Sequence, residues 1–200
     1  MVLDGIVISL VVGFLRKGSL KGFMYPIFSF GWVFPILLFL QLTFFYYQNE
    51  SGLIAVLSNY MYIFIYLLGL FFLWMNRHLK GFNMVFIGVF LNFLVMFING
   101  GRMPVSEEAS VILDPLYIEA MKEGLYGKHA MLTESTRLPF LGDIIPITSP
   151  YPKSQVISIG DVIMNIGIFL FIQDRMIHKK AQQQGDITTN VQAQETEVIK

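Results

Sequence analysis

Three long stretches of the chain contain no charged residue, and they constrain its fold more than any other feature. They cover residues 22–49, 51–76 and 81–101, which is 28, 26 and 21 residues. The elements of a soluble domain usually keep one face in water, so uncharged runs of this length are not expected there. Charged residues form only 14% of the sequence. The pattern indicates an integral membrane protein and argues against a soluble enzyme, a nucleic-acid binder and a disordered chain.

The apolar runs are continuous, which favours helices over barrel strands. Residues 34–47 and 62–75 are apolar at nearly every position, whereas a strand of a membrane barrel alternates apolar and polar side chains. Inside lipid, a continuous apolar run satisfies its backbone groups only as a helix. We therefore predict an all-α integral membrane protein with five transmembrane helices, over residues 2–15, 31–47, 53–75, 82–98 and 156–173.

A long loop and a polar tail complete the predicted organisation. Residues 1–180 form a single membrane domain, with an extracytoplasmic loop over residues 99–155 and a disordered cytoplasmic tail over residues 181–200. Within the loop, Asp114 followed by Pro115 predicts a short capped helix over residues 115–123, and Ser106 with two following glutamates predicts a turn before it. The prolines of the later loop prevent a long helix there.

The basic residues are unevenly divided between the two sides that five spans would create. One side receives nine of the 14 Lys and Arg residues, namely Arg16, Lys17, Lys21, Arg77, Lys80, Arg175, Lys179, Lys180 and Lys200. The other side receives Glu50 and the long loop, where seven acidic residues outnumber five basic ones. The positive-inside rule then places the N-terminus outside and the C-terminus in the cytoplasm.

Several polar residues fall near the outer ends of the predicted spans. The candidate ligand-binding residues are Asp4, Asn99, Arg102, His129, Glu134, Arg137, Asp143 and Asp161. An ionisable group at membrane depth is costly and is usually paired. One interpretation is a structural salt bridge between Arg102 and an aspartate. The other is a polar pocket for a lipid headgroup, an ion or a substrate.

The sequence gives little support for other kinds of site. The chain has no cysteine, which excludes disulfides and thiolate chemistry. His129, Glu134, Asp143 and Asp161 show no metal-binding spacing, and no Gly-x-Ser-x-Gly motif occurs, so we expect neither a metal nor a cofactor. The amides Gln41, Asn59, Asn92 and Asn165 lie within predicted spans. There they would either join helices or line a solute path.

Several short motifs resemble a known family. They are Asn76-Arg77-His78-Leu79, Asn92-Phe93-Leu94-Val95, Asn99-Gly100-Gly101-Arg102-Met103-Pro104-Val105, Leu132-Thr133-Glu134 with Thr136-Arg137-Leu138, Phe140-Leu141-Gly142-Asp143-Ile144-Ile145-Pro146 and Ser158-Ile159-Gly160-Asp161-Val162. Over residues 1–173 the chain resembles small bacterial multi-spanning membrane proteins catalogued as a domain of unknown function. The resemblance implies a location in the bacterial cytoplasmic membrane and brings no activity, cofactor or catalytic residue.

Three functions are compatible with these observations. We expect a non-enzymatic membrane component that binds a lipid, a solute or a partner through the outer polar cluster. Its expected partners are membrane lipids, together with either a partner membrane protein or further copies of the chain. We expect no nucleic-acid partner. The first alternative is an enzyme acting at the outer face, with Asp143, Glu134 or His129 in acid–base roles. The second is a small oligomeric carrier. A raised carboxyl pKa in an outer cavity would favour the enzyme.

Overall fold

The structure is a computed structural model that describes residues 2–24, 28–47, 52–123 and 128–177, with backbone only for the helical residues 44–47 and 52–59. Its long helices are α1 (Val2–Leu15), α2 (Val33–Tyr47), α3 (Gly52–Met75), α4 (Phe82–Ile98) and a further helix over residues 159–177. A short 3-10 helix, η1 (Leu20–Phe23), follows α1. A helix lies within or over most of each predicted range, although the last begins at residue 159, after strand β4 (Gln155–Ile157), and extends to residue 177.

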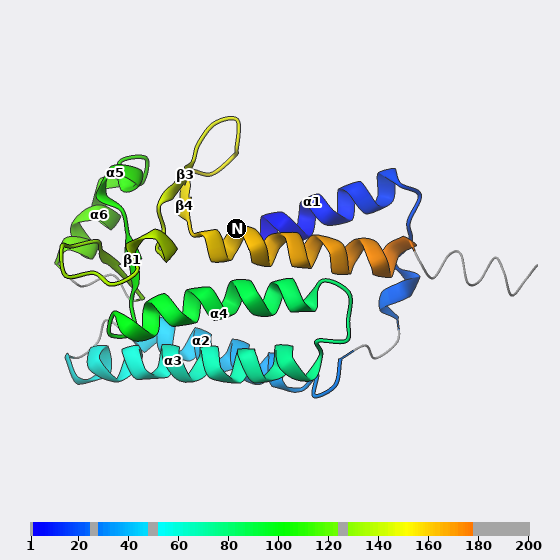
Figure 1. Ribbon diagram of the computed structural model, residues 1–200, viewed down its shortest axis with the longest axis horizontal. Coiled ribbons are helices and arrows are strands. Elements are labelled where there is room, and N and C mark those ends of the chain that lie inside the picture. The colour runs from blue at the N-terminus through cyan, green and yellow to red at the C-terminus, as the bar shows by residue number, and fades with distance from the viewer. Residues whose placement is uncertain (1, 25–27, 48–51, 124–127, 178–200) are drawn as a thin grey trace, which may run out of the picture.

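The long helices run along one axis and form an elongated bundle. In Figure 1, α4 lies between the α2–α3 pair on one side and α1 with the 159–177 helix on the other. Glycines allow two of these contacts. A Cβ placed on Gly167 would lie 2.6 Å from the carbonyl oxygen of Gly81, at the start of α4. A Cβ on Gly13 of α1 would lie 2.2 Å from the Met176 sulfur.

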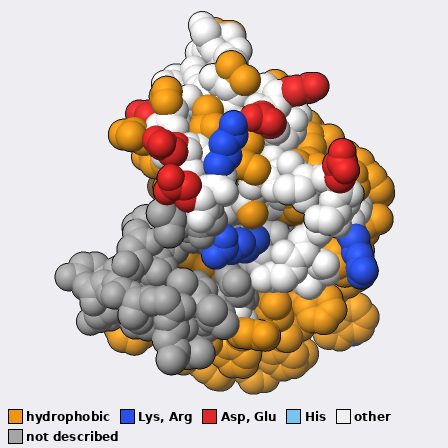
Figure 2. Space-filling view, turned by 90° about the vertical axis from the view of Figure 1, so that its left-hand side faces the viewer, with side chains coloured by type: hydrophobic (Ala, Val, Ile, Leu, Met, Phe, Trp, Pro, Cys, Tyr) orange, Lys and Arg blue, Asp and Glu red, His pale blue; other side chains and the backbone are white. Residues whose placement is uncertain are grey.

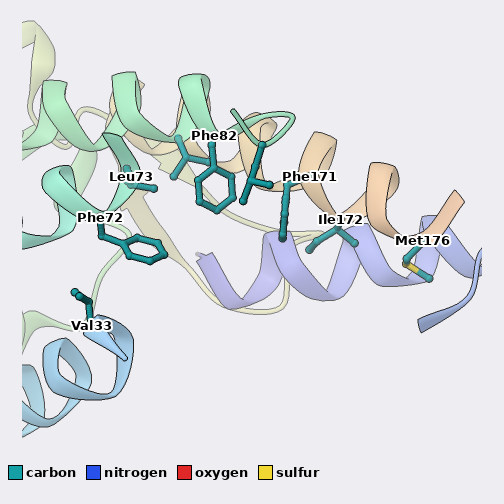
Figure 3. Packing of buried hydrophobic residues seen from close by; sticks show 9 residues of the cluster. Val33, Phe72, Leu73, Phe82, Phe171, Ile172 and Met176 are labelled. Carbon is teal, nitrogen blue, oxygen red and sulfur yellow. The ribbon is translucent and has the colours of Figure 1, made fainter. Parts of the chain in front are cut away.

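An aromatic core holds the bundle together at the end far from the long loop. Phe72 of α3, Phe82 of α4 and Phe171 of the 159–177 helix belong to one buried cluster there, together with Val33 of α2 (Figure 3). The ring of Phe28 lies between them, with its centroid 5.6–5.7 Å from those of the three other phenylalanines. The ring centroids of Phe82 and Phe171 are 5.0 Å apart with an interplanar angle of 64°. Each fully buried side chain of this size contributes about 1.5–3 kcal/mol to folding.

The prediction of five transmembrane helices is wrong. Within the described residues, no helix has both the length and the apolar character needed to cross a membrane. Three of the predicted spans, α1, α2 and α4, contain 14, 15 and 17 residues, whereas a bilayer requires about 20 apolar residues. The apolar sequence of the 159–177 helix is interrupted by polar residues, namely Asp161, Asn165, Gln173, Asp174 and Arg175. The uncharged stretches predicted where the helices lie, but they did not predict how long each helix is.

The all-α prediction is also wrong, because residues 99–158, which we call the loop segment, contain four strands. β1 (Met103–Val105) pairs in parallel with β2 (His129–Met131), and β3 (Ile145–Ile147) pairs antiparallel with β4 (Gln155–Ile157). Three-residue strands are too short to show a period in the sequence. The tail over residues 181–200, for which we predicted disorder, lies outside the described residues.

The helices of the loop segment follow their predicted caps. α5 (Glu107–Ser110) has Ser106 as its N-cap, and α6 (Pro115–Lys122) has Asp114, whose carboxylate accepts from the Leu116 N–H at 2.9 Å. The later part forms η2 (Pro139–Leu141) instead of a long helix, as its prolines predicted. A second apolar cluster joins the loop segment to α3 and α4, and it contains Tyr62, Val95, Met96, Met103 and Leu141.

Candidate functional site

Charged side chains of both signs gather at the end of the bundle that carries the loop segment. Figure 2 views this end and shows acidic and basic groups over the loop segment, with apolar side chains below them. Two of the pockets formed by the described residues are lined mainly by this segment. We name them the Asp143 pocket and the Arg102 pocket after a residue in each lining. Val105 and His129 of the β1–β2 pair line the first, and Pro104 and Ala130 line the second.

Asp143 is held in place by its own backbone, which extends the small β1–β2 sheet. Its N–H donates to the carbonyl of Pro104 at 2.8 Å, and its carbonyl accepts from the N–H of Ser106 at 2.9 Å. The preceding residue must be small, because a Cβ on Gly142 would lie 2.6 Å from the Pro104 carbonyl oxygen. The Gly142-Asp143 pair therefore brings a carboxyl group against β1, where only glycine permits so close an approach.

The Asp143 pocket has a volume of about 370 Å³, within the range typical of small-molecule sites. Its polar lining residues are Asp114, His129, Asp143, Lys153, Ser154 and Gln155. Its remaining lining is mostly apolar and comprises Val105, Ile112, Leu113, Tyr117, Met121 and Val156. Such a mixed lining suits a molecule with both a polar group and an apolar part.

His129 and Asp143 form a pair at this pocket, in which the His129 side chain is 24% exposed. His129 Nε2 lies 3.6 Å from Asp143 Oδ2, and the Asp143 side chain is only 9% exposed. Its other oxygen, Oδ1, has no hydrogen-bond partner among the described residues. Burial, with a smaller contribution from the nearby Asp161 charge, raises the pKa of Asp143 to about 8. Burial lowers the pKa of His129 to about 3. At neutral pH the pair is therefore largely uncharged.

Asp161 takes part in a separate network that caps the 159–177 helix. The Asp161 N–H donates to Ser158 Oγ at 3.0 Å, and the Ser158 N–H donates back to Asp161 Oδ2 at 3.3 Å, which is a capping box. Asn92 of α4 completes the network, since its Nδ2 donates to Asp161 Oδ1 at 2.9 Å and its Oδ1 accepts from Ser158 Oγ at 2.8 Å. Both Asp161 oxygens thus serve a structural role.

The Arg102 pocket also borders the β1–β2 pair and has a volume of about 550 Å³. Its lining residues are Ile98, Asn99, Arg102, Pro104, Ala130, Met131, Thr133, Ser135, Thr136 and Arg137. Asn99 fixes one wall, because its Oδ1 accepts from the Arg137 N–H at 2.9 Å and its Nδ2 donates to the Arg137 carbonyl at 2.9 Å. This pairing ties the 133–137 turn to the end of α4.

The structure divides the eight predicted site residues among different places. His129 and Asp143 share one pocket, whereas Asn99, Arg102 and Arg137 share the other. Glu134 is exposed in the 133–137 turn and lines neither of these pockets. Asp161 caps a helix, and Asp4 of α1 lies beside Tyr151 and Gln155, next to the Asp143 pocket. The sequence thus identified polar positions at one end of the molecule but merged two sites into one.

Sequence reasoning missed several residues of these sites. Lys153, Ser154 and Gln155 line the Asp143 pocket, yet they stand in a proline-rich stretch with no motif. Tyr117 and Met121 were detectable, since residues four apart on the predicted 115–123 helix share one face. Among the amides within predicted spans, Asn92 and Asn165 bond to Asp161, Gln41 is exposed, and Asn59 lies outside the described side chains. No three metal-ligating side chains come together among the described residues.

Comparison with known proteins places the chain in a family without assigning an activity. A protein from Thermotoga maritima described as uncharacterized is 38% identical over 105 residues, which cover 52% of this chain and 57% of that protein. The match therefore spans little more than half of either chain. No solved structure matches. The family model of DUF5317, described as a family of unknown function, matches residues 27–173. The chain belongs to this family.

Proposed function

We propose that the protein binds a small molecule in the Asp143 pocket. A donor group of this ligand forms a hydrogen bond that the Asp143 carboxyl group accepts. The observation that carries this proposal is the carboxyl group of Asp143, a lining residue of a pocket of about 370 Å³, whose oxygen Oδ1 is buried and has no hydrogen-bond partner among the described residues. A buried polar group without a hydrogen bond costs about 1–3 kcal/mol. A ligand group that filled this position would recover that cost, which gives the pocket a physical reason to bind.

The lining indicates the chemical class of the ligand. An amine or a hydroxyl can donate to Asp143, and an amine would in addition favour the ionised carboxylate. Gln155 and Ser154 offer further hydrogen bonds at the rim, while Ile112, Met121 and their apolar neighbours accept a hydrocarbon part. We therefore propose a small amphipathic amine or alcohol, with binding and not catalysis as the main activity.

Ligand-observed NMR with separate panels of small primary amines and small alcohols tests this proposal. We expect binders in at least one panel, and Asp143→Asn should weaken them about tenfold or more, the effect of losing one charge-assisted hydrogen bond. Glu119→Gln is the matched control, since Glu119 is exposed on α6 and does not line the pocket. Binding that is the same in Asp143→Asn and in the unmodified protein would contradict the proposal, as would the absence of binders in both panels.

A second candidate is an enzyme that uses the same pair for proton transfer, and the protonation state of Asp143 favours it. Because burial raises the pKa of Asp143 to about 8, this residue can act as a general acid near pH 7, whereas His129, whose pKa burial lowers to about 3, is unprotonated but only a weak base. Glu134, the third predicted acid–base residue, does not line the Asp143 pocket. Incubation of each NMR binder with the protein decides between the candidates. Turnover that both Asp143→Asn and His129→Gln abolish would support the enzyme, and unchanged ligands would support binding alone.

Lipid contact is a further part of the proposal, suggested by the apolar surface of the helices. Leu3 and Leu15 of α1 are 75% and 78% exposed, and Phe39 of α2 is 69% exposed. Extended apolar surface of this kind normally marks an interaction site. Arg16, Lys17, Arg77 and Lys80 lie in the turns at one end of these helices, where they would attract anionic headgroups. We propose that lipid acyl chains cover these faces.

Fractionation of a bacterial host and flotation with vesicles test the lipid contact and the predicted location at the cytoplasmic membrane. The protein should sediment with membranes and float with phosphatidylglycerol vesicles, and replacing Arg77 and Lys80 with Gln should reduce flotation at low salt. A protein that stays in the supernatant as a defined oligomer would contradict this and would show that other copies of the chain cover the apolar faces.

A further inference from the structure

We propose that the Arg102 pocket binds a phosphate group carried by a larger molecule. Two guanidinium groups, those of Arg102 and Arg137, and three hydroxyl groups line this pocket of about 550 Å³. Arginine recognises phosphate through paired N–H groups in a planar fork, which fits two phosphate oxygens at once. The proposal concerns a different pocket from that of Asp143 and does not depend on a ligand there.

The three hydroxyl groups lie close together in the 133–137 turn. Thr133 Oγ1 lies 2.9 Å from Ser135 Oγ and 3.4 Å from Thr136 Oγ1. Thr136 Oγ1 also accepts from the Thr133 N–H at 2.9 Å, and each of the three hydroxyl groups carries one hydrogen that it can donate. A phosphate has only acceptor oxygens when ionised, so such a group of donors fits it better than it fits a neutral polar ligand.

Hydrogen bonds within the protein hold the walls of the Arg102 pocket in place without a ligand. Asn99 pairs through both amide atoms with the backbone of Arg137, and its Nδ2 also donates to the Val95 carbonyl at 2.7 Å. The Met96 carbonyl accepts from the Gly101 N–H at 2.8 Å. These bonds satisfy carbonyls in the last turn of α4, which would otherwise present partial negative charge toward the pocket. A preformed frame lowers the entropy cost of binding.

Two features bear on the nature of the ligand. The volume exceeds that of phosphate alone, and Ile98, Pro104, Ala130 and Met131 supply apolar contacts beside the charged groups. The ligand is therefore a phosphate ester whose remaining part is at least partly apolar. A free phosphorylated metabolite and a phospholipid headgroup share this chemistry. Glu134, in the same turn, is the acidic residue nearest to Arg137 in the sequence, but it does not line the pocket.

The variants that test the site replace one guanidinium at a time. Arg137→Gln is the first choice, because the side chain is exposed and the Asn99 pairing uses only its backbone. Arg102→Gln is the second variant, and Arg137→Lys retains the charge while removing the fork. Lys122→Gln is the matched control, since it removes a cation of the same loop segment whose exposed ion pair with Glu107 contributes little to stability.

The probes are inorganic phosphate and glycerol 3-phosphate in calorimetry, and phosphatidylcholine vesicles with and without phosphatidylglycerol in flotation. Binding of the soluble probes that Arg137→Gln and Arg102→Gln weaken about tenfold or more, with partial recovery in Arg137→Lys, supports the site and a free phosphate ester. Loss of phosphatidylglycerol-dependent flotation in the same variants, without binding of the soluble probes, supports the site and a headgroup. Binding that neither variant changes, or that Lys122→Gln reduces equally, overturns the proposal.

Discussion

A Cβ placed on Gly88 of α4 would lie 2.4 Å from the carbonyl oxygen of Gly160, so these two residues bring two helices into backbone contact. The contact is reciprocal, because a Cβ on Gly160 would lie 2.7 Å from the Gly88 carbonyl and 2.1 Å from Asn92 Oδ1. Asn92 reaches the capping box of the 159–177 helix at this same crossing. The two glycines thus set the distance over which the Asn92 network operates.

Alanine at either position should destabilise the protein strongly. Each added Cβ meets a backbone carbonyl of the other helix, which cannot move aside as the end of a side chain can, and the Cβ on Gly160 also meets the Asn92 amide, so Gly88→Ala or Gly160→Ala must separate the two helices. We expect a loss of about 1–3 kcal/mol or more in the free energy of unfolding, measured by chemical denaturation. Gly69→Ala is the control, since nothing lies within 4 Å of a Cβ there. It should be neutral or stabilise α3 by about 0.5–1 kcal/mol. Equal effects at all three positions would contradict the close contact.

The pairing of Asn99 with Arg137 predicts a local effect on the loop segment. Asn99→Ala removes three side-chain hydrogen bonds, two to Arg137 and one to the Val95 carbonyl. At about 0.5–1.5 kcal/mol for each bond, the loss in stability should be about 1.5–4.5 kcal/mol. Hydrogen exchange should rise at the 133–137 turn before it rises in the helices. Asn83→Ala, on the exposed face of α4, should leave both quantities unchanged. Uniform acceleration of exchange would show that Asn99 supports the whole fold instead of the turn.

The His129–Asp143 pair predicts how stability depends on pH. Because folding raises the pKa of Asp143 from 3.8 to about 8, its favourable contribution is complete below pH 3.8 and is lost as pH rises toward 8. Because folding lowers the pKa of His129 from 6.5 to about 3, its contribution is complete above pH 6.5 and is lost as pH falls toward 3. The two slopes cancel between pH 3.8 and 6.5. A net decline remains between pH 6.5 and 8.

Thermal unfolding across this range measures the effect. The unmodified protein should lose up to about 1.4 kcal/mol per pH unit between pH 6.5 and 8 from this pair. Asp143→Asn should remove that decline, whereas His129→Gln should extend it downward toward pH 3.8. A decline of the same size in Asp143→Asn would mean that another group takes up the proton.

The sequence predicted helix positions well because apolar runs, caps and turn residues act locally. The ends of α1 and α4 agree with the predicted ranges, and the cap of α6 follows from Asp114 and Pro115 alone. The membrane-spanning interpretation failed because absence of charge does not measure the length of an apolar helix. The strands were missed because β1 and β2 gain their pairing from residues more than 20 positions apart, which leaves no local pattern.

The candidate sites show the same limit. Asp143 and Asp161 each follow a glycine, and their places near the outer ends of the predicted spans assigned both to one polar cluster. In the structure both glycines permit a close backbone approach, but Asp143 turns into a pocket while Asp161 bonds to its own helix cap. Which neighbour an aspartate meets is decided by tertiary packing. Composition and spacing could therefore name the residues without separating their roles.

The charge of Asp161 should raise the pKa of Asp143 through electrostatic repulsion. Asp161 is the second cause of the raised pKa of Asp143, after burial, because two nearby negative charges repel each other. Asp161→Asn removes the charge and keeps an oxygen that can accept from Asn92. The pKa of Asp143 should then fall, yet stay above 3.8, since the burial is unchanged. A carbon-detected NMR titration of the Asp143 carboxyl measures this directly. Glu119→Gln, a substitution on the exposed surface of α6, should leave the pKa of Asp143 unchanged. An Asp143 pKa that is the same with and without the Asp161 charge would show that the two carboxyls are electrostatically independent.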